Sequence, residues 1–393
     1  MTIKSALRDY QLQNKKIFLR VDLNVPLRDG TIMNDYRLKA ITPTLDFCVT
    51  HGAIVILATH IGRPQKASPD LSTKNLIPWF EKNGYALLFE PNFEALSSKQ
   101  YAPGTIILLE NLRFYAGEKS GDAQFARALA AIADYYVNDA FATLHRTDAS
   151  VVLVPEYFAH NHKTIGFLIE KELNVLAQLM HAPKLPYVLV LGGGKVSDKI
   201  PILQNLLQSV STVLLCPAIV FTFLKSLGKP VGKSLVDDHA LIMCKELLAA
   251  AKRHNVRIVF PLDYQVTRDS SNAQLMCVDA DHIPADALGV SIGPKTIAAW
   301  SPIIHDAKTI FYNAAMGFSD QPSTWQNAQT LLRVIAESPA FTVIGGGDSV
   351  TMAQGLEPKY HFSFFSTGGG ATLAALSGTP LPGLRALGIM PPN

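Results

Sequence analysis

The sequence has few cysteines and no long hydrophobic run. Its four cysteines, Cys48, Cys216, Cys244 and Cys277, are far apart and form no CxxC pair. This spacing argues against a zinc site or a disulfide framework and is typical of a reducing compartment. No apolar run reaches the length of a membrane span, and the first 20 residues lack the apolar core of a secretory signal. We therefore expect a soluble, cytoplasmic protein that does not bind membranes.

Charged residues are also scarce. They make up 17% of the 393 residues, whereas hydrophobic residues make up 48%. This balance is typical of a globular protein with a large core and excludes a disordered chain. The length predicts two or three domains. The net charge of +3 gives no indication of nucleic-acid binding.

A P-loop is missing as well, although GKPVGKS at 228–234 resembles one. Only three residues separate its two glycines instead of four, and Pro230 has no N–H to donate. We interpret this segment as a surface turn between a helix and a strand-like segment.

Short apolar runs alternate with helical patterns along the chain. KIFLRVDL, AIVILATH and TIILLENL in the first half, and YVLVLGGG and FTVIGGG in the second, are typical of buried strands. This alternation predicts an α/β fold with parallel sheets and crossover helices, in which ligands bind beyond the carboxyl ends of the strands. Residues 166–180 have helical periodicity and precede a proline-rich linker, so we expect two α/β halves joined by one helix.

Three predicted strands in the second half end in glycine triplets. These are LGGGKVSDK (191–199), VIGGGDSVTMA (343–353) and FSTGGGATLAAL (365–376), each followed by a helical pattern. Bare backbone next to a helix N-terminus favours phosphate binding. None fits the dinucleotide fingerprint, because Ser197, Val350 and Leu373 replace its final Gly or Ala, which argues against a dehydrogenase.

Charged residues accompany these glycines. Lys195 and Lys199 are four residues apart and so share one face of a helix, where they can neutralise phosphate oxygens. Asp348 is consistent with two roles, a ligand of Mg²⁺ or an ordinary helix N-cap.

Polar residues end the predicted strands of the first half. Eight arginines lie in the first 150 residues, against five in the remaining 243. A group of polar and cationic residues falls at or near strand ends: Asp22, Asn24, Arg37, His60, Arg63, Arg113 and Arg146. Because the ends of parallel strands share one edge of a sheet, this pattern predicts a pocket for an anionic substrate.

Together these segments resemble phosphoglycerate kinases. The shared motifs are, in chain order, RVDLNVP, THIGRP, LLENLRFYAGE, VNDAFATLHR, GFLIEKEL, LGGGKVSDKI, IGGGD and STGGGA. Their order and spacing match the family from about residue 17 to the end.

The resemblance implies two Rossmann-like, three-layer αβα domains joined by a hinge. A phosphoglycerate-binding domain would span 1–166, a hinge helix 167–180 and a nucleotide-binding domain 181–377, with residues 378–393 packing back on the first domain. The implied activity is the glycolytic, reversible phosphoryl transfer from 1,3-bisphosphoglycerate to ADP, giving 3-phosphoglycerate and ATP. Mg²⁺, hinge closure and a monomeric state would accompany it.

The resemblance also assigns roles to the matching positions. Phosphoglycerate would be held by Asp22, Asn24, Arg37, His60, Arg63, Arg113 and Arg146. The nucleotide would be held by Gly193, Lys195, Lys199, Asn313, Asp320, Gly346, Gly347, Asp348 and Ser349. The phosphoryl group in transfer would meet Arg37, Lys195, Gly369 and Gly370. Asp348 would hold Mg²⁺.

The departures from the family fall mostly in the second half. The first half differs mildly, with Thr59 for serine and Ala142 for glycine. In the second half Cys216-Pro217-Ala218 replaces a glycine triplet beside the nucleotide base, and NGPVGVFE becomes Asn313–Asp320, NAAMGFSD. The ribose-binding glutamate is therefore at best Asp320, and Ala374 replaces another glutamate.

Three interpretations follow from these departures. The protein uses ADP and ATP in a rebuilt pocket, or it uses a different nucleotide or polyphosphate donor, or it is a weakly active phosphoglycerate-binding scaffold. The phosphate-binding lysines and Asp348 argue against the third, because a scaffold has no physical need for them.

Overall fold

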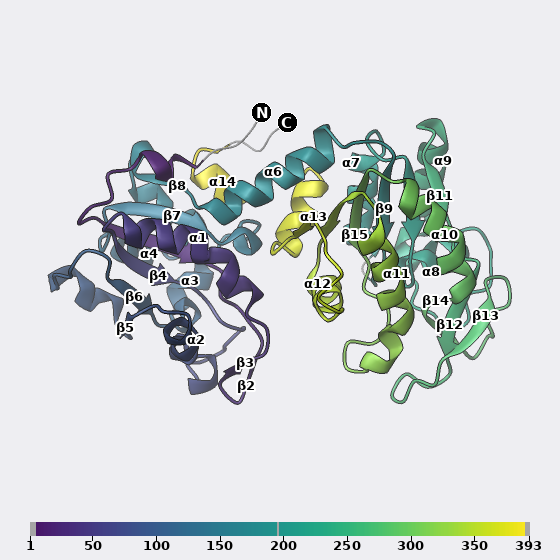
Figure 1. Ribbon diagram of the computed structural model, residues 1–393, viewed down its shortest axis with the longest axis horizontal. Coiled ribbons are helices and arrows are strands. Elements are labelled where there is room, and N and C mark those ends of the chain that lie inside the picture. Colours follow the sequence, from purple (N-terminus) through teal and green to yellow (C-terminus); the bar gives the residue numbers. More distant parts are fainter. Residues whose placement is uncertain (1–4, 195, 390–393) are drawn as a thin grey trace. The chain divides into compact units, whose positions relative to one another are not determined.

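The computed structural model of the chain describes residues 5–194 and 196–389 (Figure 1). Two compact units are present. Unit 1 contains the residues up to Val175 and those from Pro380 onward, and unit 2 is Leu176–Thr379. The helix α6 (Phe167–His181) contains the point of division.

Unit 1 is built on a six-stranded sheet in which every neighbouring pair is parallel. Its strands, in spatial order, are β5 (Leu87–Glu90), β6 (Ile106–Leu109), β4 (Ile54–Ala58), β1 (Lys16–Val21), β7 (Tyr135–Asp139) and β8 (Lys163–Ile165). All five residues of β4 are buried, as expected of a parallel strand covered on both faces. The α-helices of the unit are α1 (Tyr36–Thr50), α2 (Ile77–Lys82), α3 (Ala116–Ser120), α4 (Ala123–Ala130), α5 (Ala149–Val152) and α14 (Pro382–Ala386). A short hairpin pairs β2 (Leu27–Arg28) with β3 (Thr31–Ile32).

The C-terminal helix α14 belongs to unit 1. The backbone N–H of Gly383 donates to the carbonyl of Leu144 at 3.0 Å. A Cβ atom at Gly383 would lie 2.7 Å from the Leu144 side chain and 2.9 Å from that of Val151. Glycine therefore allows α14 to approach α5 and the segment before it closely.

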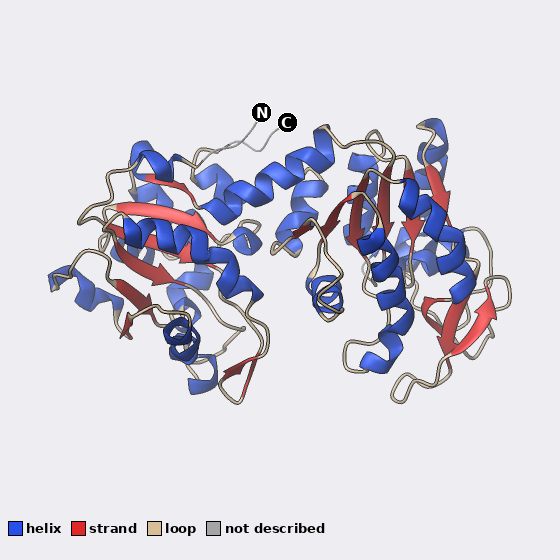
Figure 2. Cartoon of the chain, viewed as in Figure 1, coloured by secondary structure: helices blue, strands red, loops and turns tan. Residues whose placement is uncertain are grey.

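Unit 2 contains a second six-stranded parallel sheet. Its strands, in spatial order, are β11 (Arg257–Val259), β10 (Thr212–Leu215), β9 (Tyr187–Leu191), β15 (Thr309–Asn313), β16 (Phe341–Ile344) and β17 (Phe364–Phe365). Its helices are α7 (Val196–Leu206), α8 (Ile219–Ser226), α9 (Leu241–Arg253), α10 (Pro294–Asp306), α11 (Gln326–Glu337), α12 (Gly347–Gln354) and α13 (Gly370–Leu376). Figure 2 shows helices around the strands of each large sheet. The predicted α/β fold with two parallel sheets is confirmed.

Unit 2 also contains an antiparallel sheet that the sequence pattern did not predict. It places β12 (Asp263–Thr267) between β13 (Met276–Asp279) and β14 (Leu288–Ile292). Among the described residues, no helix combines the length and apolar character that a membrane span requires.

The segment GKPVGKS forms a turn after α8, as expected, but no strand follows it directly in the described chain. The N–H of Lys233 donates to the carbonyl of Ala287 at 2.8 Å, and the Ser234 hydroxyl accepts from the N–H of Gly289 at 2.8 Å. The chain then continues irregularly to a 3-10 helix at Asp238–Ala240.

Candidate active site

The predicted substrate-binding residues of unit 1 gather at one edge of its sheet. Asp22 follows β1, His60 follows β4, Arg113 follows β6 and Arg146 follows β7. These four strands are adjacent and parallel in the order β6-β4-β1-β7, so their carboxyl ends lie side by side. Arg37 reaches the group from the first turn of α1.

Asp22 forms the centre of this cluster. Its carboxylate is 6% exposed, pairs with the Arg37 guanidinium and lies 4.0 Å from Nδ1 of His60. The N–H of Asn24 donates to the same carboxylate at 3.1 Å. Burial opposes ionisation, but the charge of Arg37 and the hydrogen bond from the Asn24 N–H outweigh it and lower the pKa of Asp22 below its ordinary value.

Two predicted residues fix the loop that follows β4. The side-chain oxygen of Asn24 accepts from the N–H of Gly62 at 2.8 Å, and Nη1 of Arg113 donates to the carbonyl of Gly62 at 2.6 Å. Arg63 is the next residue in this loop, and its side chain is exposed. The loop therefore presents Arg63 to solvent from a rigid base.

Arg113 and Arg146 lie close enough to repel each other. Burial and the charge of Arg146 lower the pKa of Arg113, and an ion pair with Asp148 at 3.4 Å opposes this effect. Among the described residues, Nε of both arginines is buried without a hydrogen-bond partner. Buried donors of this kind are normally satisfied, so an anion that accepts from them would stabilise the cluster.

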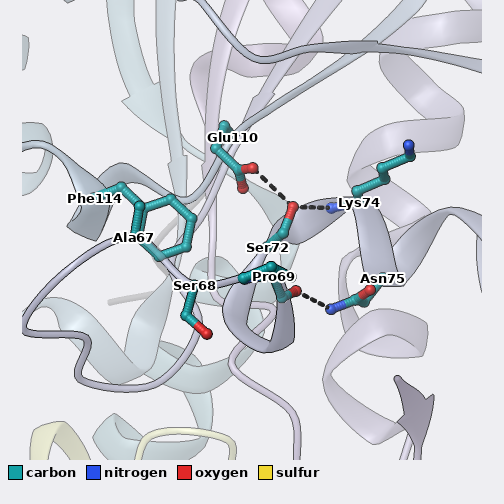
Figure 3. Close-up of a pocket in the computed structure, with 8 residues that line it drawn as sticks. All are labelled: Ala67, Ser68, Pro69, Ser72, Lys74, Asn75, Glu110 and Phe114. Carbon is teal, nitrogen blue, oxygen red and sulfur yellow. Dashed lines mark hydrogen bonds between the residues drawn. The ribbon is translucent and has the colours of Figure 1, made fainter. Parts of the chain in front are cut away.

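A separate cavity of about 460 Å³ lies beside the same loop (Figure 3). The Ser72 hydroxyl donates to Glu110 at 2.7 Å and accepts from the N–H of Lys74 at 3.2 Å, while the Asn75 amide donates to the carbonyl of Pro69 at 2.9 Å. These polar groups of the cavity wall form hydrogen bonds with neighbouring protein groups, and the Phe114 ring lies beside them. These hydrogen bonds therefore fix the wall of the cavity beside the loop after β4.

The glycine triplets of unit 2 follow the ends of β9, β16 and β17. Gly193, Gly346 and Gly369 have φ values of 96°, 94° and 48°, in the region that favours glycine. At the end of β15, the Asn313 amide donates to the carbonyl of Gly345 at 2.7 Å. A Cβ at Gly346 would lie 2.7 Å from the same amide nitrogen, so the second loop is held tightly against Asn313.

The charged residues around these loops are partly described. Lys195 lies outside the described residues. Lys199 lies on α7 with 7% of its surface exposed, and burial lowers its pKa to about 8, against the opposing charge of Asp198. Asp348 is not the N-cap of α12, because Gly346 occupies that position and Asp348 lies within the first turn. Ser349 follows it and is buried.

Asp320 and Asp348 line one pocket of about 350 Å³, together with Ser319, Thr351, Trp325 and neighbouring residues. No group of three or more His, Cys, Asp or Glu residues able to hold a metal is found within 5–194 and 196–389. Mg²⁺ is commonly bound by one or two carboxylates together with substrate phosphates and water. The Asp348 carboxylate in this pocket therefore fits Mg²⁺ that arrives with a nucleotide.

The segment Cys216–Ala218 packs directly on the first glycine loop. The N–H of Gly193 donates to the carbonyl of Pro217 at 3.1 Å. A Cβ at Gly192 would lie 2.9 Å from Cβ of Cys216, and one at Gly194 would lie 2.6 Å from the exposed Leu235 side chain. The wall beside this loop is thus made of small and apolar groups.

Sequence reasoning missed the residues behind the unit 1 cluster. Arg20 is wholly buried in β1, and its guanidinium contacts His60, Ser150 and the carbonyl of Val21. An arginine inside an apolar strand is a signal that could have revealed it, since unpaired buried charges are rare.

Unit 1 carries an arginine-rich anion site, and unit 2 carries glycine loops, a buried lysine and two carboxylates that line one pocket. These features define the class: a two-domain phosphotransferase. A family model described as phosphoglycerate kinase matches residues 7–379. The chain belongs to the phosphoglycerate kinase family, glycolytic kinases that transfer a phosphoryl group to a carboxyl group and use adenine nucleotides.

Individual relatives match over nearly their whole length. The phosphoglycerate kinase of Bdellovibrio bacteriovorus is 38% identical over 389 residues, which cover 97% of this chain and 96% of the relative. That of Dictyoglomus turgidum is 38% identical over 391 residues and covers 97% of each chain. Among solved structures, the Coxiella burnetii phosphoglycerate kinase matches with a TM-score of 0.84 and 31% identity, covering 97% of this chain and 98% of that one. The Pyrococcus horikoshii OT3 enzyme matches with a TM-score of 0.81 and 30% identity, with the same coverage.

Proposed function

We propose that this chain transfers a phosphoryl group between 1,3-bisphosphoglycerate and ADP, with the triose bound at unit 1 and the nucleotide at unit 2. The observation that carries the proposal is a set of buried nitrogen atoms without partners among the described residues: Nε2 of His60, Nε of Arg113 and Nε of Arg146. These atoms lie at neighbouring strand ends, where a small, highly charged anion would accept from them.

In this proposal the triose is held by two kinds of group. His60, Arg63, Arg113 and Arg146 donate to its phosphate and carboxyl oxygens, whereas Asp22 and Asn24 accept from its hydroxyl group. The lowered pKa of Asp22 supports an ionised acceptor at neutral pH. Arg37, which pairs with Asp22, also reaches the phosphoryl group in transfer.

The nucleotide phosphates bind at the glycine loops. N–H groups at the starts of α7 and α12, with Lys195 and Lys199, neutralise the phosphate oxygens. Gly193, Gly346, Gly347 and Ser349 would provide this backbone surface, with Asn313 behind it. Asp320 would bind the ribose.

Asp348 would hold Mg²⁺, which supplies positive charge to the phosphates when bound.

The chemical step needs no covalent intermediate with the protein. The bond between phosphorus and the acyl oxygen breaks as a new bond forms between phosphorus and a terminal oxygen of ADP, and 3-phosphoglycerate leaves as a carboxylate. Lys195 and the N–H groups of Gly369 and Gly370 would stabilise the equatorial oxygens. Bending at α6 would bring the two substrates together and exclude water, which would otherwise hydrolyse the acyl phosphate.

An end-point assay in the reverse direction tests this function. The purified protein is incubated with ATP, 3-phosphoglycerate and Mg²⁺, and the acyl phosphate is trapped with hydroxylamine as a hydroxamate. We expect product only when all three are present, and its loss with excess EDTA. A folded protein that gives no hydroxamate under these conditions would contradict the proposal.

We also propose that the protein acts as a cytoplasmic monomer, as the resemblance implies. Light scattering coupled to gel filtration would give a mass near 42.8 kDa for a monomer. A mass of twice that value, unchanged on dilution, would contradict the monomer. Cell fractionation tests the location.

A further inference from the structure

Arg20 is buried behind the anion site and does not reach it. It lies in β1 with none of its surface exposed, so it cannot touch a substrate that enters from solvent. Each guanidinium nitrogen has a partner. Nε donates to the Ser150 hydroxyl at 2.8 Å, Nη1 donates to the carbonyl of Val21, and Nη2 lies 3.3 Å from Nδ1 of His60.

The contact with Arg20 determines which nitrogen of His60 carries the proton. A guanidinium only donates hydrogen bonds, so Nδ1 of His60 must accept. The alternative partner of Nδ1, the Asp22 carboxylate, is 4.0 Å away and beyond hydrogen-bond distance. In a neutral ring the proton therefore resides on Nε2.

The surroundings of the His60 ring keep it neutral. Burial lowers the pKa of His60 well below its ordinary value. Asp22 opposes this effect, whereas the charges of Arg20, Arg113 and Arg146 add to it. The Nε2 atom is buried and has no partner within the described chain, so it is an unsatisfied N–H donor at the anion site.

A carboxylate and a hydroxyl from two other elements hold Arg20 in place. Ser150, on α5, accepts from Arg20 and donates from its hydroxyl to Glu118 at 2.5 Å and from its N–H at 2.9 Å. Glu118, on α3, has no exposed surface and lies 3.9 Å from Nη2 of Arg20. Burial raises the pKa of Glu118, but Arg20 and both Ser150 donors favour its ionised form. The buried charges thus compensate each other.

We propose that Arg20, held by Glu118 and Ser150, is a positioning residue that keeps His60 in the tautomer with its proton on Nε2, ready to donate to an oxygen of the bound triose. The hydrogen bond from His60 to the triose rests on the proposed function, whereas the assignment of the tautomer does not. In this arrangement, the buried side chains of Glu118 on α3 and Ser150 on α5 hold Arg20, and Arg20 sets the hydrogen-bonding direction of His60 after β4.

The direct test is NMR of the imidazole nitrogens in uniformly ¹⁵N-labelled, substrate-free protein at pH 7 to 8. Long-range ¹H–¹⁵N correlations distinguish a ring protonated at Nε2 from one protonated at Nδ1. The spectrum of His60→Gln assigns the signals. We expect a single Nε2–H tautomer for His60. An Nδ1–H tautomer, or an equal mixture, would overturn the proposal even if no variant folds.

The double substitution Arg20→Gln with Glu118→Gln removes the charged pair and keeps the buried charge balanced. We expect His60 to lose its single tautomer and the KM for 3-phosphoglycerate to rise about tenfold, as for one lost hydrogen bond to an anion. The KM for ATP should not change. If the double variant keeps both the Nε2–H tautomer and the wild-type KM, Arg20 does not position His60.

Tyr136→Phe is the matched control. The Tyr136 hydroxyl is buried nearby, donates to the carbonyl of Ser150 at 2.8 Å and accepts from the Asn138 amide at 3.0 Å, and neither bond involves Arg20. It should lower stability and leave the tautomer intact. A tautomer change in this control equal to that of the double variant would mean that general loosening of the core is responsible. If wild-type His60 has the expected tautomer but 3-phosphoglycerate does not bind, the proposed function fails and the role of Arg20 in setting the tautomer stands.

Discussion

The candidate sites of the two units consist of different kinds of group. In unit 1 the site consists of side chains that hold one another: Asp22 binds Arg37, Asn24 and Arg113 hold the loop after β4, and Arg20 contacts His60. In unit 2 it consists largely of backbone at glycine loops, with Asn313 behind one of them. A network of side chains loses several contacts when one residue changes, whereas bare backbone keeps its N–H groups when neighbours change. The departures from the family pattern fall mainly in unit 2, where the three glycine triplets are nevertheless retained.

The largest expected effect comes from breaking the unit 1 network. Arg113→Met removes the bond to the Gly62 carbonyl and leaves the Asp148 carboxylate without this ion pair. We expect kcat/KM for 3-phosphoglycerate to fall by about two to three orders of magnitude, because a buried charged partner is lost as well as a substrate contact. Steady-state kinetics measure the loss. Arg127→Met, which removes an equal charge from the exposed face of α4, should have no such effect, and equal losses in both variants would rule out a local role for Arg113.

Next in size is the effect of Lys199, the buried lysine of unit 2. Its pKa of about 8 means that the ammonium form dominates below pH 8 and is lost as the pH rises above it. Only the ammonium form attracts phosphate, so the KM for ATP should rise with pH above about 8. Lys199→Met should raise that KM by about a hundredfold and remove the rise with pH. A wild-type KM that is constant from pH 7 to 9.5 would contradict the role of Lys199.

A smaller effect is expected from crowding one glycine loop. Gly346→Ala places a Cβ 2.7 Å from the Asn313 amide at a φ of 94°. We expect the KM for ATP to rise by about tenfold, since the loop must move away from Asn313. Gly228→Ala is the control, because its φ is 75° and no atom lies within 4 Å of the added Cβ. It should reduce stability and leave the KM unchanged, so a shared change in KM would indicate a global effect.

The smallest effect is expected where unit 2 carries backbone strain. Ala218 precedes α8 with a φ of 20°, which a residue with a Cβ adopts at a cost. Ala218→Gly should increase the free energy of unfolding by about 1 kcal/mol, measured by urea denaturation, and change the KM for ATP less than threefold. A loss of stability would show that no strain is stored there.

The sequence predicts some features of the fold and site because their signals are local. Buried parallel strands such as β4 are continuous apolar runs, and the polar residues at their ends follow within a few positions. Arg20 could not be predicted in this way, because its partners His60 and Ser150 are 40 and 130 residues distant in sequence. The antiparallel sheet of β12, β13 and β14 was missed for a related reason. Its strands are joined by the segments 268–275 and 280–287 instead of short turns, and β13 is only half-buried, so no apolar run marks it.

The most direct test of the account is steady-state phosphoryl transfer to 3-phosphoglycerate from a panel of nucleoside triphosphates with Mg²⁺. Unit 2 keeps its glycine loops, Lys199 and the Asp320–Asp348 pocket while the wall at Cys216–Ala218 is altered. The account predicts turnover with ATP as the preferred donor. Absence of turnover with ATP, from folded protein that still binds 3-phosphoglycerate, would contradict it.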